Sequence, residues 1–415
     1  MASSSGDAGR ASLPDLTTTS PLSELVGGVP SVRITIPDAY LVDSRLEAPG
    51  AEGLAIQRLL TLAQRNVKLT FAWEPAAARR ILESPAVHPL AALSLCLSQA
   101  DHELPKDPTI DMRRAVEAAR TRLLAHRLGT DMFSDRQMLL CIDHHRPSLP
   151  PDLYDVPRKR LRSDEEFESL VDDLLSSQKT QGLDQGFVSK CRLPLAVILR
   201  ELIENTDDHA KTGADGNILK PNALRGVLVK RILQARQLPT NEARKDDSLL
   251  PCLEFTIFDA GIGYYDSYRR QLLRGQARGE PVTVGEKQGD VIRRHPLSSE
   301  VPLETEHAIL LKCLERHSEQ AIPDPRPGHR GLGLYEVLRA LKMMSGLFEV
   351  RTGRIHGYRS FLRGEHRIQL EPDSSKSRPG MPKPSLLDVS RRNVPRPTAH
   401  EQVCGSVVRV VIPLE

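Results

Sequence analysis

Residues 199–210 read Leu-Arg-Glu-Leu-Ile-Glu-Asn-Thr-Asp-Asp-His-Ala, and this stretch carries the most information in the chain. At about 100° per residue on a helix, one broad face gathers Leu195, Ile198, Leu199, Leu202 and Thr206. Glu201, Asn205 and Asp208 lie at i, i+4 and i+7, so they form a polar stripe beside that face. Such carboxylate and amide groups suit a divalent cation and an attacking water. By itself the stretch fits either a helix that lines a pocket or an ordinary amphipathic helix with a solvated acidic side.

A second motif, Asp259-Ala-Gly261-Ile-Gly263, follows an alternating strand pattern at 252–258. A carboxylate at a strand end can accept hydrogen bonds from an exocyclic amine such as that of adenine. The two glycines let the backbone turn tightly against a flat ligand. Strand-end turns use these residue types widely, so the motif alone is weak.

A third motif, Gly328-His-Arg-Gly-Leu-Gly-Leu334, opens a helical pattern that continues to Met344. Glycines before a helix expose backbone N–H groups, and the positive end of the helix dipole favours an anion such as phosphate. Arg330 adds a cation beside Gly331 and Gly333. The spacing is neither the dinucleotide fingerprint nor a P-loop. Gly405-Ser406 then introduces the last predicted strand, 407–412.

In their order along the chain, these features resemble the GHKL superfamily of ATPases, which groups gyrase, the large heat-shock chaperone, histidine kinases and mismatch-repair ATPases. The resemblance covers about residues 185–415. It implies a two-layer α/β sandwich, the Bergerat-type ATP-binding fold, in which helices cover a mixed sheet on one side. It also implies bound ATP and Mg²⁺ between the helices and a flexible lid, which falls at 264–327.

The resemblance also implies roles for individual residues. Asn205 looks like the magnesium-coordinating asparagine, Glu201 like the general base that orients the hydrolytic water, and Asp208 takes a supporting place near the nucleotide. On the purine side, Asp259 looks like the aspartate that bonds the adenine amine. The remaining binding positions are Gly261 and Gly263 in the purine pocket, Arg330, Gly331 and Gly333 at the phosphates, and Ser406 where many members have a threonine. Two departures are His329 in place of a common glycine and a proline-rich, mobile insertion at 372–400.

The length of 415 residues favours two domains. Residues 1–29, rich in Ser, Thr, Gly, Ala and Pro, are predicted to be a disordered tail. Strand and helix patterns alternate over 30–146, which predicts a smaller α/β domain of unknown role. Its expected strands are 32–36, 67–73 and 138–142, and its later helices span about 75–100 and 111–128. Four prolines and a basic run indicate a linker with a connecting helix at 147–184.

Composition excludes several classes of protein. The chain has no run of eighteen apolar residues that could span a membrane, and its N-terminus lacks a secretory signal. Six scattered cysteines without a Cys-x-x-Cys pair indicate reduced thiols and a cytoplasmic location. A net charge of +3 and an aromatic content of 4% give no indication of nucleic-acid binding.

Three functions fit these observations. The first is an ATPase whose nucleotide cycle controls a protein partner or a homodimer interface. The second is a protein kinase, either of the anti-sigma type, which acts on a serine of a partner, or of the histidine kinase type. For a histidine kinase the best phosphoacceptor candidates are His144 and His145, but this stretch runs into Pro150 and Pro151, which prevent a helix. The third is a non-catalytic module that senses ATP. Buried polar groups are costly without a ligand, and this cost argues mildly against a dead site.

Overall fold

The computed structural model describes residues 9–18, 20–26, 30–42, 48–97, 100–105, 111–128, 136–143, 148–179, 185–211, 223–235, 249–277, 301–314, 333–362, 385–390 and 396–414. These residues form a mixed α/β protein with a four-stranded parallel sheet, a seven-stranded antiparallel sheet and a small two-stranded ribbon. No helix among them is both long and apolar enough to cross a lipid bilayer.

The parallel sheet has the strand order β1-β2-β3-β4. Its strands are β1 (Gly9–Ser12), β2 (Ser31–Ile36), β3 (Lys68–Trp73) and β4 (Asp101–Glu103). The helices of this N-terminal unit are η1 (Leu13–Thr17), α1 (Leu22–Val26), η2 (Asp38–Val42), α3 (Ala51–Gln64), α4 (Pro75–Glu83), η3 (Pro85–Val87), α5 (Pro89–Cys96) and α6 (Met112–Leu124). Strands β2 and β3 confirm two of the predicted strands.

Two predictions for the N-terminal unit are wrong. Residues 9–18 and 20–26 are not a disordered tail, because β1 pairs with β2 and Leu13, Leu16 and Leu22 are at most 1% exposed. Apolar side chains in a Ser- and Thr-rich segment were enough to order it. The helix expected at 75–100 is broken into α4, η3 and α5, each of which starts at a proline. A proline lacks the backbone N–H that would continue the preceding helix.

The larger sheet has the order β12-β11-β10-β13-β9-β8-β5, and all of its neighbours are antiparallel, so the expected mixed sheet is corrected. Its strands are β5 (Arg136–Ile142), β8 (Leu224–Ala235), β9 (Leu249–Asp259), β10 (Leu347–Gly353), β11 (Ile355–Ser360), β12 (Leu387–Asp388) and β13 (Val403–Pro413). Strand β12 falls inside the predicted insertion at 372–400 and pairs with β11.

Strand β5 joins this sheet as its edge strand, although the sequence placed it in the first domain. It pairs with β8 along its whole length, from Arg136 opposite Lys230 to Ile142 opposite Leu224. Met138 and Ile142 pack in the core shared with the N-terminal unit, whereas Leu139 and Cys141 pack in the core on the other face. The domain boundary expected at residue 146 therefore does not separate two independent cores.

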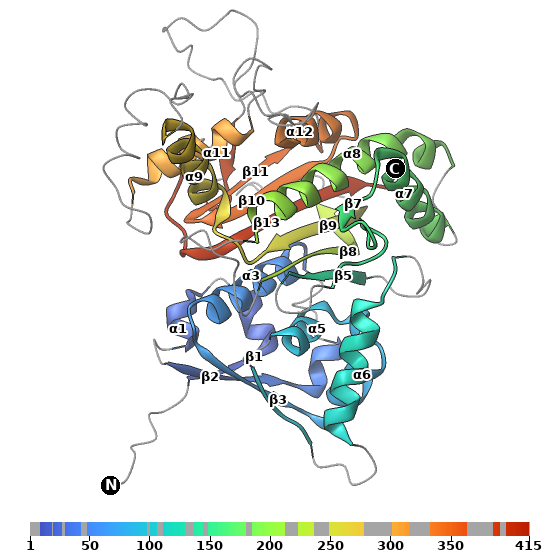
Figure 1. Cartoon of the computed structure of the whole chain (residues 1–415), viewed down its shortest axis with the longest axis vertical. Helices are drawn as coiled ribbons and strands as arrows, with labels where there is room; N and C mark the ends of the chain where they lie inside the picture. Colours follow the sequence, from blue (N-terminus) through green and yellow to red (C-terminus); the bar gives the residue numbers. More distant parts are fainter. Residues whose placement is uncertain are drawn as a thin grey trace, which may run out of the picture.

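Helices cover both faces of the seven-stranded sheet (Figure 1). On one face lie α7 (Asp164–Lys179), α8 (Gln185–His209) and α12 (Gly333–Met343). On the other face lies α3 of the N-terminal unit, where a Cβ added to Gly53 would stand 2.9 Å from Thr256 Cγ2 on β9. The helices of the C-terminal half described above cover one face of the sheet, as expected, but the N-terminal unit covers the other face.

Other elements complete this half. The ribbon of β6 (Tyr154–Asp155) and β7 (Arg160–Leu161) and helix α7 occupy the predicted linker and connecting helix. Within the predicted lid, α9 (Gly263–Ala277) and α11 (Leu303–Cys313) are described, and they pack against each other.

Candidate functional site

Glu201 and Asn205 lie one turn apart on α8 and face the start of α12. A Cβ added to Gly333, the first residue of α12, would stand 2.9 Å from Glu201 Oε2 and 3.3 Å from Asn205 Nδ2. The helix forms here because Leu195, Ile198, Leu199, Leu202 and Thr206 are buried as the periodicity predicted. The amide, the carboxylate and the positive end of a helix dipole thus meet at one place.

The amide nitrogen of Asn205, Nδ2, is buried and lacks a hydrogen-bond partner in the described part of the chain. A buried amide without a partner costs free energy, so its retention needs a compensating contact. An amide also supplies the oxygen that a hard cation prefers.

Burial raises the pKa of Glu201 to about 7, and the neighbouring Glu204, Asp164 and Glu336 act in the same direction. Arg200 opposes them, with its Nη1 atom 3.5 Å from Glu201 Oε1. A carboxylate with a pKa close to neutral is suited to orient and deprotonate water.

Asp259 ends β9 and is 7% exposed. Burial raises its pKa to about 6, although its Oδ1 atom accepts a hydrogen bond from the backbone N–H of Gly261 at 2.8 Å. The following turn passes close to the end of α8, since a Cβ on Gly261 would stand 2.6 Å from Ala210 Cα. Ala210 lies five residues beyond Asn205, about 7.5 Å along a helix axis. Asn205 thus lies within α8, and the turn that follows Asp259 lies at the end of the same helix.

The backbone around Asp259 requires glycine at two positions. Gly263 and Gly405 have φ values of +77° and +68°, a region that favours glycine. A Cβ on Gly405 would stand 1.9 Å from the carbonyl oxygen of Asp259. Ser406 lies opposite Asp259 in the β13–β9 register.

Thr352 on β10 also contacts this part of the structure, and no local sequence pattern indicates it. Its hydroxyl lies 3.3 Å from Ser406 Oγ and accepts a hydrogen bond from the backbone N–H of Tyr264 at 3.1 Å. It therefore connects β10, β13 and the start of α9, the helix that begins the predicted lid.

A buried arginine on the strand beside Asp259 also has no local sequence signal. Arg225 lies opposite Asp259 in the β8–β9 register and is 1% exposed. Its Nε and Nη2 atoms donate to the two carboxylate oxygens of Asp143 at 2.7 and 3.0 Å, and Nη2 also donates to Asp207 Oδ1 at 2.8 Å. Tyr154 donates to the same Asp207 oxygen at 2.8 Å. This network anchors the last turn of α8 to the sheet.

The remaining predicted residues are placed as follows. Asp208 is exposed on the last turn of α8. The preceding residue, Asp207, is the one that accepts a hydrogen bond from Arg225. Arg330 and Gly331 lie outside the described residues, as do His144 and His145.

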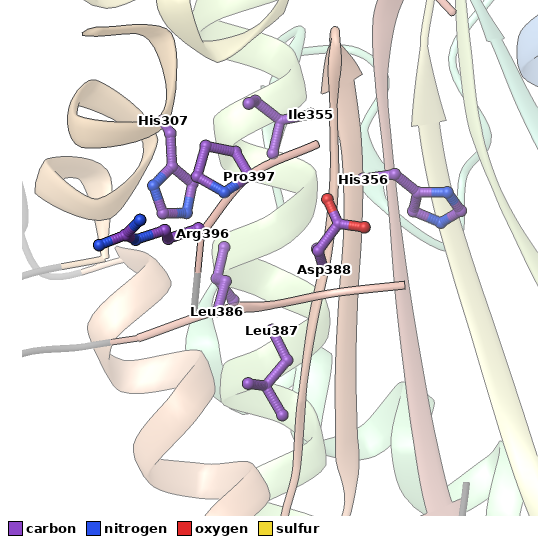
Figure 2. A pocket seen from close by; sticks show the side chains of 9 residues that line it. His307, Ile355, His356, Leu386, Leu387, Asp388, Arg396 and Pro397 are labelled. Carbon is purple, nitrogen blue, oxygen red and sulfur yellow. The ribbon is translucent and has the colours of Figure 1, made fainter. Parts of the chain in front are cut away.

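A separate small pocket lies between α11, β11 and β12, and none of the predicted site residues lines it (Figure 2). In Figure 2, Asp388 lies between His307 and His356. Its carboxylate accepts hydrogen bonds from the backbone N–H groups of Ser390 at 2.8 Å and Thr398 at 2.7 Å. Asp388 therefore organises the chain around β12. Within the described part of the chain, no three His, Cys, Asp or Glu residues are grouped so that they could hold a metal ion.

Comparisons with protein-family models, with curated proteins and with solved structures found no match to this chain.

Proposed function

We propose that the chain binds Mg-ATP in a GHKL-type site between α8, α12 and the ends of β9 and β13, and hydrolyses it to control a protein partner or a homodimer interface. The observation that carries this proposal is the buried Nδ2 atom of Asn205, which has no hydrogen-bond partner among the described residues and lies beside Glu201 at the start of α12. The polar groups of this site fit the two ends of one ligand, a magnesium-bound phosphate chain and an adenine.

In the proposed site, the Asn205 amide oxygen is a ligand for Mg²⁺, and the backbone N–H groups at the start of α12 receive the phosphates. Bound Mg²⁺ supplies positive charge that offsets the charge of the phosphates. Glu201 holds and polarises a water molecule. Asp259 accepts a hydrogen bond from the adenine amine, and the turn through Gly261 and Gly263 lets the backbone approach the flat base.

Binding and hydrolysis are tested separately. Calorimetry with ATP and Mg²⁺ should show binding to the wild-type protein, and Asn205→Ala and Asp259→Ala should each weaken it at least tenfold. Glu201→Gln should keep binding and abolish the release of labelled phosphate from γ-labelled ATP. Glu168→Gln, on the outer helix α7 and paired with Arg192 at 2.9 Å, is the matched control and should hydrolyse ATP like the wild type.

The fate of the label separates the alternatives. Free phosphate that disappears in Glu201→Gln supports the ATPase. Label on the protein itself, or on a co-purified partner, would instead support a histidine kinase or an anti-sigma type serine kinase. Binding without any transfer of label would support the ATP-sensing module. Absence of ATP binding by the wild-type protein would refute the nucleotide site.

A further inference from the structure

Helix α3 contacts β10 directly beside the purine side of the proposed site. The Gln57 side chain donates to the backbone carbonyl of Arg351 at 3.0 Å, and Arg351 immediately precedes Thr352. Gln57 is fully buried, so water does not compete for this bond. The contact joins the N-terminal unit to the strand whose Thr352 hydroxyl touches Ser406.

Helix α3 also contacts β13 directly before the site. The backbone N–H of Cys404 donates to Thr61 Oγ1 at 3.0 Å, and Cys404 immediately precedes Gly405 and Ser406. The Thr61 hydroxyl itself donates to the carbonyl of Gln57 at 2.8 Å, which leaves its oxygen free to accept from Cys404. Thr61, like Gln57, is fully buried.

The sheet alone does not fix this part of β13. Thr352 lies opposite Ser406, but the next residue, Gly353, lies opposite Val403, so Cys404 and Gly405 form a bulge. On the other side, pairing with β9 ends at Ser406 opposite Asp259. A bulge leaves its extra residues outside the hydrogen-bonded ladder. Thr61 thus replaces the strand partner that the Cys404 N–H lacks.

A further contact anchors the residues that lead into β13. Glu401 forms an ion pair with Arg58 on α3, with 3.3 Å between its Oε2 and the arginine Nε, and Arg58 is 3% exposed. The other oxygen of Glu401 accepts a hydrogen bond from the backbone N–H of Leu22 at 2.5 Å. Arg58 also donates to the carbonyls of Leu16 and Ser20. The N-terminal segment, α3 and residues 401–404 are therefore one connected assembly.

We propose that α3 sets the nucleotide affinity of the site, with Gln57 and Thr61 as positioning residues that hold Thr352 and the Cys404–Gly405 bulge in place. A ligand or partner that moves the N-terminal unit would then change the purine side of the site through these two contacts. This inference rests on the proposed function. Energetic coupling between two sites is reciprocal, so bound ATP must also hold α3 and the bulge more firmly.

Affinity measurements test the two positioning residues. Gln57→Met removes the hydrogen bond to Arg351, and Thr61→Val removes the bonds to Cys404 and to the Gln57 carbonyl, each with little change of shape. Each substitution should weaken ATP binding about three- to tenfold. Thr121→Val is the matched control, because the Thr121 hydroxyl lies on the exposed side of α6 and donates to the backbone carbonyl of Glu117 at 2.9 Å. It should bind ATP like the wild type. Thermal melting without nucleotide shows whether each variant is folded.

Hydrogen exchange on the wild-type protein tests the same coupling without a substitution. ATP should slow amide exchange at Cys404 and in α3, but not in α6. If the wild type binds ATP while both variants bind it equally well and exchange at α3 and Cys404 does not respond, the inference is wrong and the nucleotide site stands. If the wild type does not bind ATP, both proposals are wrong.

Discussion

Asp259 combines a cost to the folded state with a proposed role in binding. Its pKa is raised from an ordinary value near 4 to about 6, so the folded protein holds this proton more tightly than the unfolded chain. Stability contributed by the protonated group is complete below pH 4 and is lost as the pH rises through 6. The carboxylate form needed for an adenine amine is thus the form that destabilises the empty protein.

We therefore expect Asp259→Asn to have opposite effects on stability and binding. The asparagine keeps an oxygen that can accept from Gly261 but carries no buried charge. At pH 8 the free energy of unfolding without nucleotide should rise by roughly 1–3 kcal/mol, as measured in urea. ATP affinity should fall, because an amide presents only one acceptor oxygen. If the free energy of unfolding of Asp259→Asn at pH 8 is unchanged or lower than that of the wild type, the buried charge of Asp259 does not destabilise the folded protein.

The rate of hydrolysis should depend on the protonation of Glu201. Because burial and nearby carboxylates raise its pKa to about 7, the rate should increase as the pH rises from 6 to 8. Arg200→Met removes the cation 3.5 Å from Glu201 and should move this rise to higher pH. Steady-state phosphate release across the pH range measures both profiles. An identical profile in the two proteins would exclude Arg200 as the opposing charge.

The residues that the sequence could and could not reveal differ in where their partners lie. Glu201 and Asn205 share one helix, so their spacing alone placed them on one stripe. Arg225 reads as an ordinary strand arginine, because its partner Asp143 is 82 residues earlier in the chain. Thr352 likewise has no local signal, since its neighbours Ser406 and Tyr264 come from other elements. Contacts made only in the folded sheet leave no trace in local sequence.

At the scale of elements, the close approach of α8 and α12 depends on Gly333. The Cβ of Gly333→Ala would crowd Glu201 Oε2 at 2.9 Å and Asn205 Nδ2 at 3.3 Å. We expect ATP affinity to fall at least fivefold by calorimetry, because the two side chains must move from the proposed ligand positions. Gly357→Ala on β11, which meets the Leu386 side chain at 3.2 Å and no residue of the site, is the control. Unchanged affinity in Gly333→Ala would show that the helices separate freely.

Periodicity identified the individual elements better than their assembly. β9, β13, α8 and α12 each carry a local pattern of period 2 or 3.6, and the structure confirms them. β5 was also recognised as a strand, but both of its faces are apolar, as in Leu139 and Leu140. A strand buried on both faces reads the same in any sheet, so its sequence could not show which sheet it joins.

At the scale of the whole molecule, the two cores share one sheet and should unfold together. The single tryptophan, Trp73 on β3, reports on the N-terminal unit through its fluorescence. Phe348→Ala opens a cavity in the opposite core and should destabilise the protein by about 3–5 kcal/mol. In the same variant, the unfolding transition reported by Trp73 fluorescence should shift to a lower urea concentration. Met343→Ala, at a side chain that is 63% exposed, should leave the transition in place.

If the urea midpoint of the Trp73 fluorescence transition is the same in Phe348→Ala and in the wild type, the two units fold independently. In that case the buried contacts of α3 with the large sheet would be weak. A common transition would instead make the N-terminal unit part of the stability of the proposed nucleotide site.

The edge position of β5 has a practical consequence for dissecting this protein. A fragment that starts at residue 185, chosen to isolate the half that carries the proposed ATP site, would lack β5 and α3. The open edge of β8 would then present unpaired backbone groups, which favour association with other chains. Arg409 and Glu254, buried where the sheet meets the N-terminal unit, would face solvent. Insolubility of such a fragment would therefore reflect a missing part of its own sheet and not a defective nucleotide site.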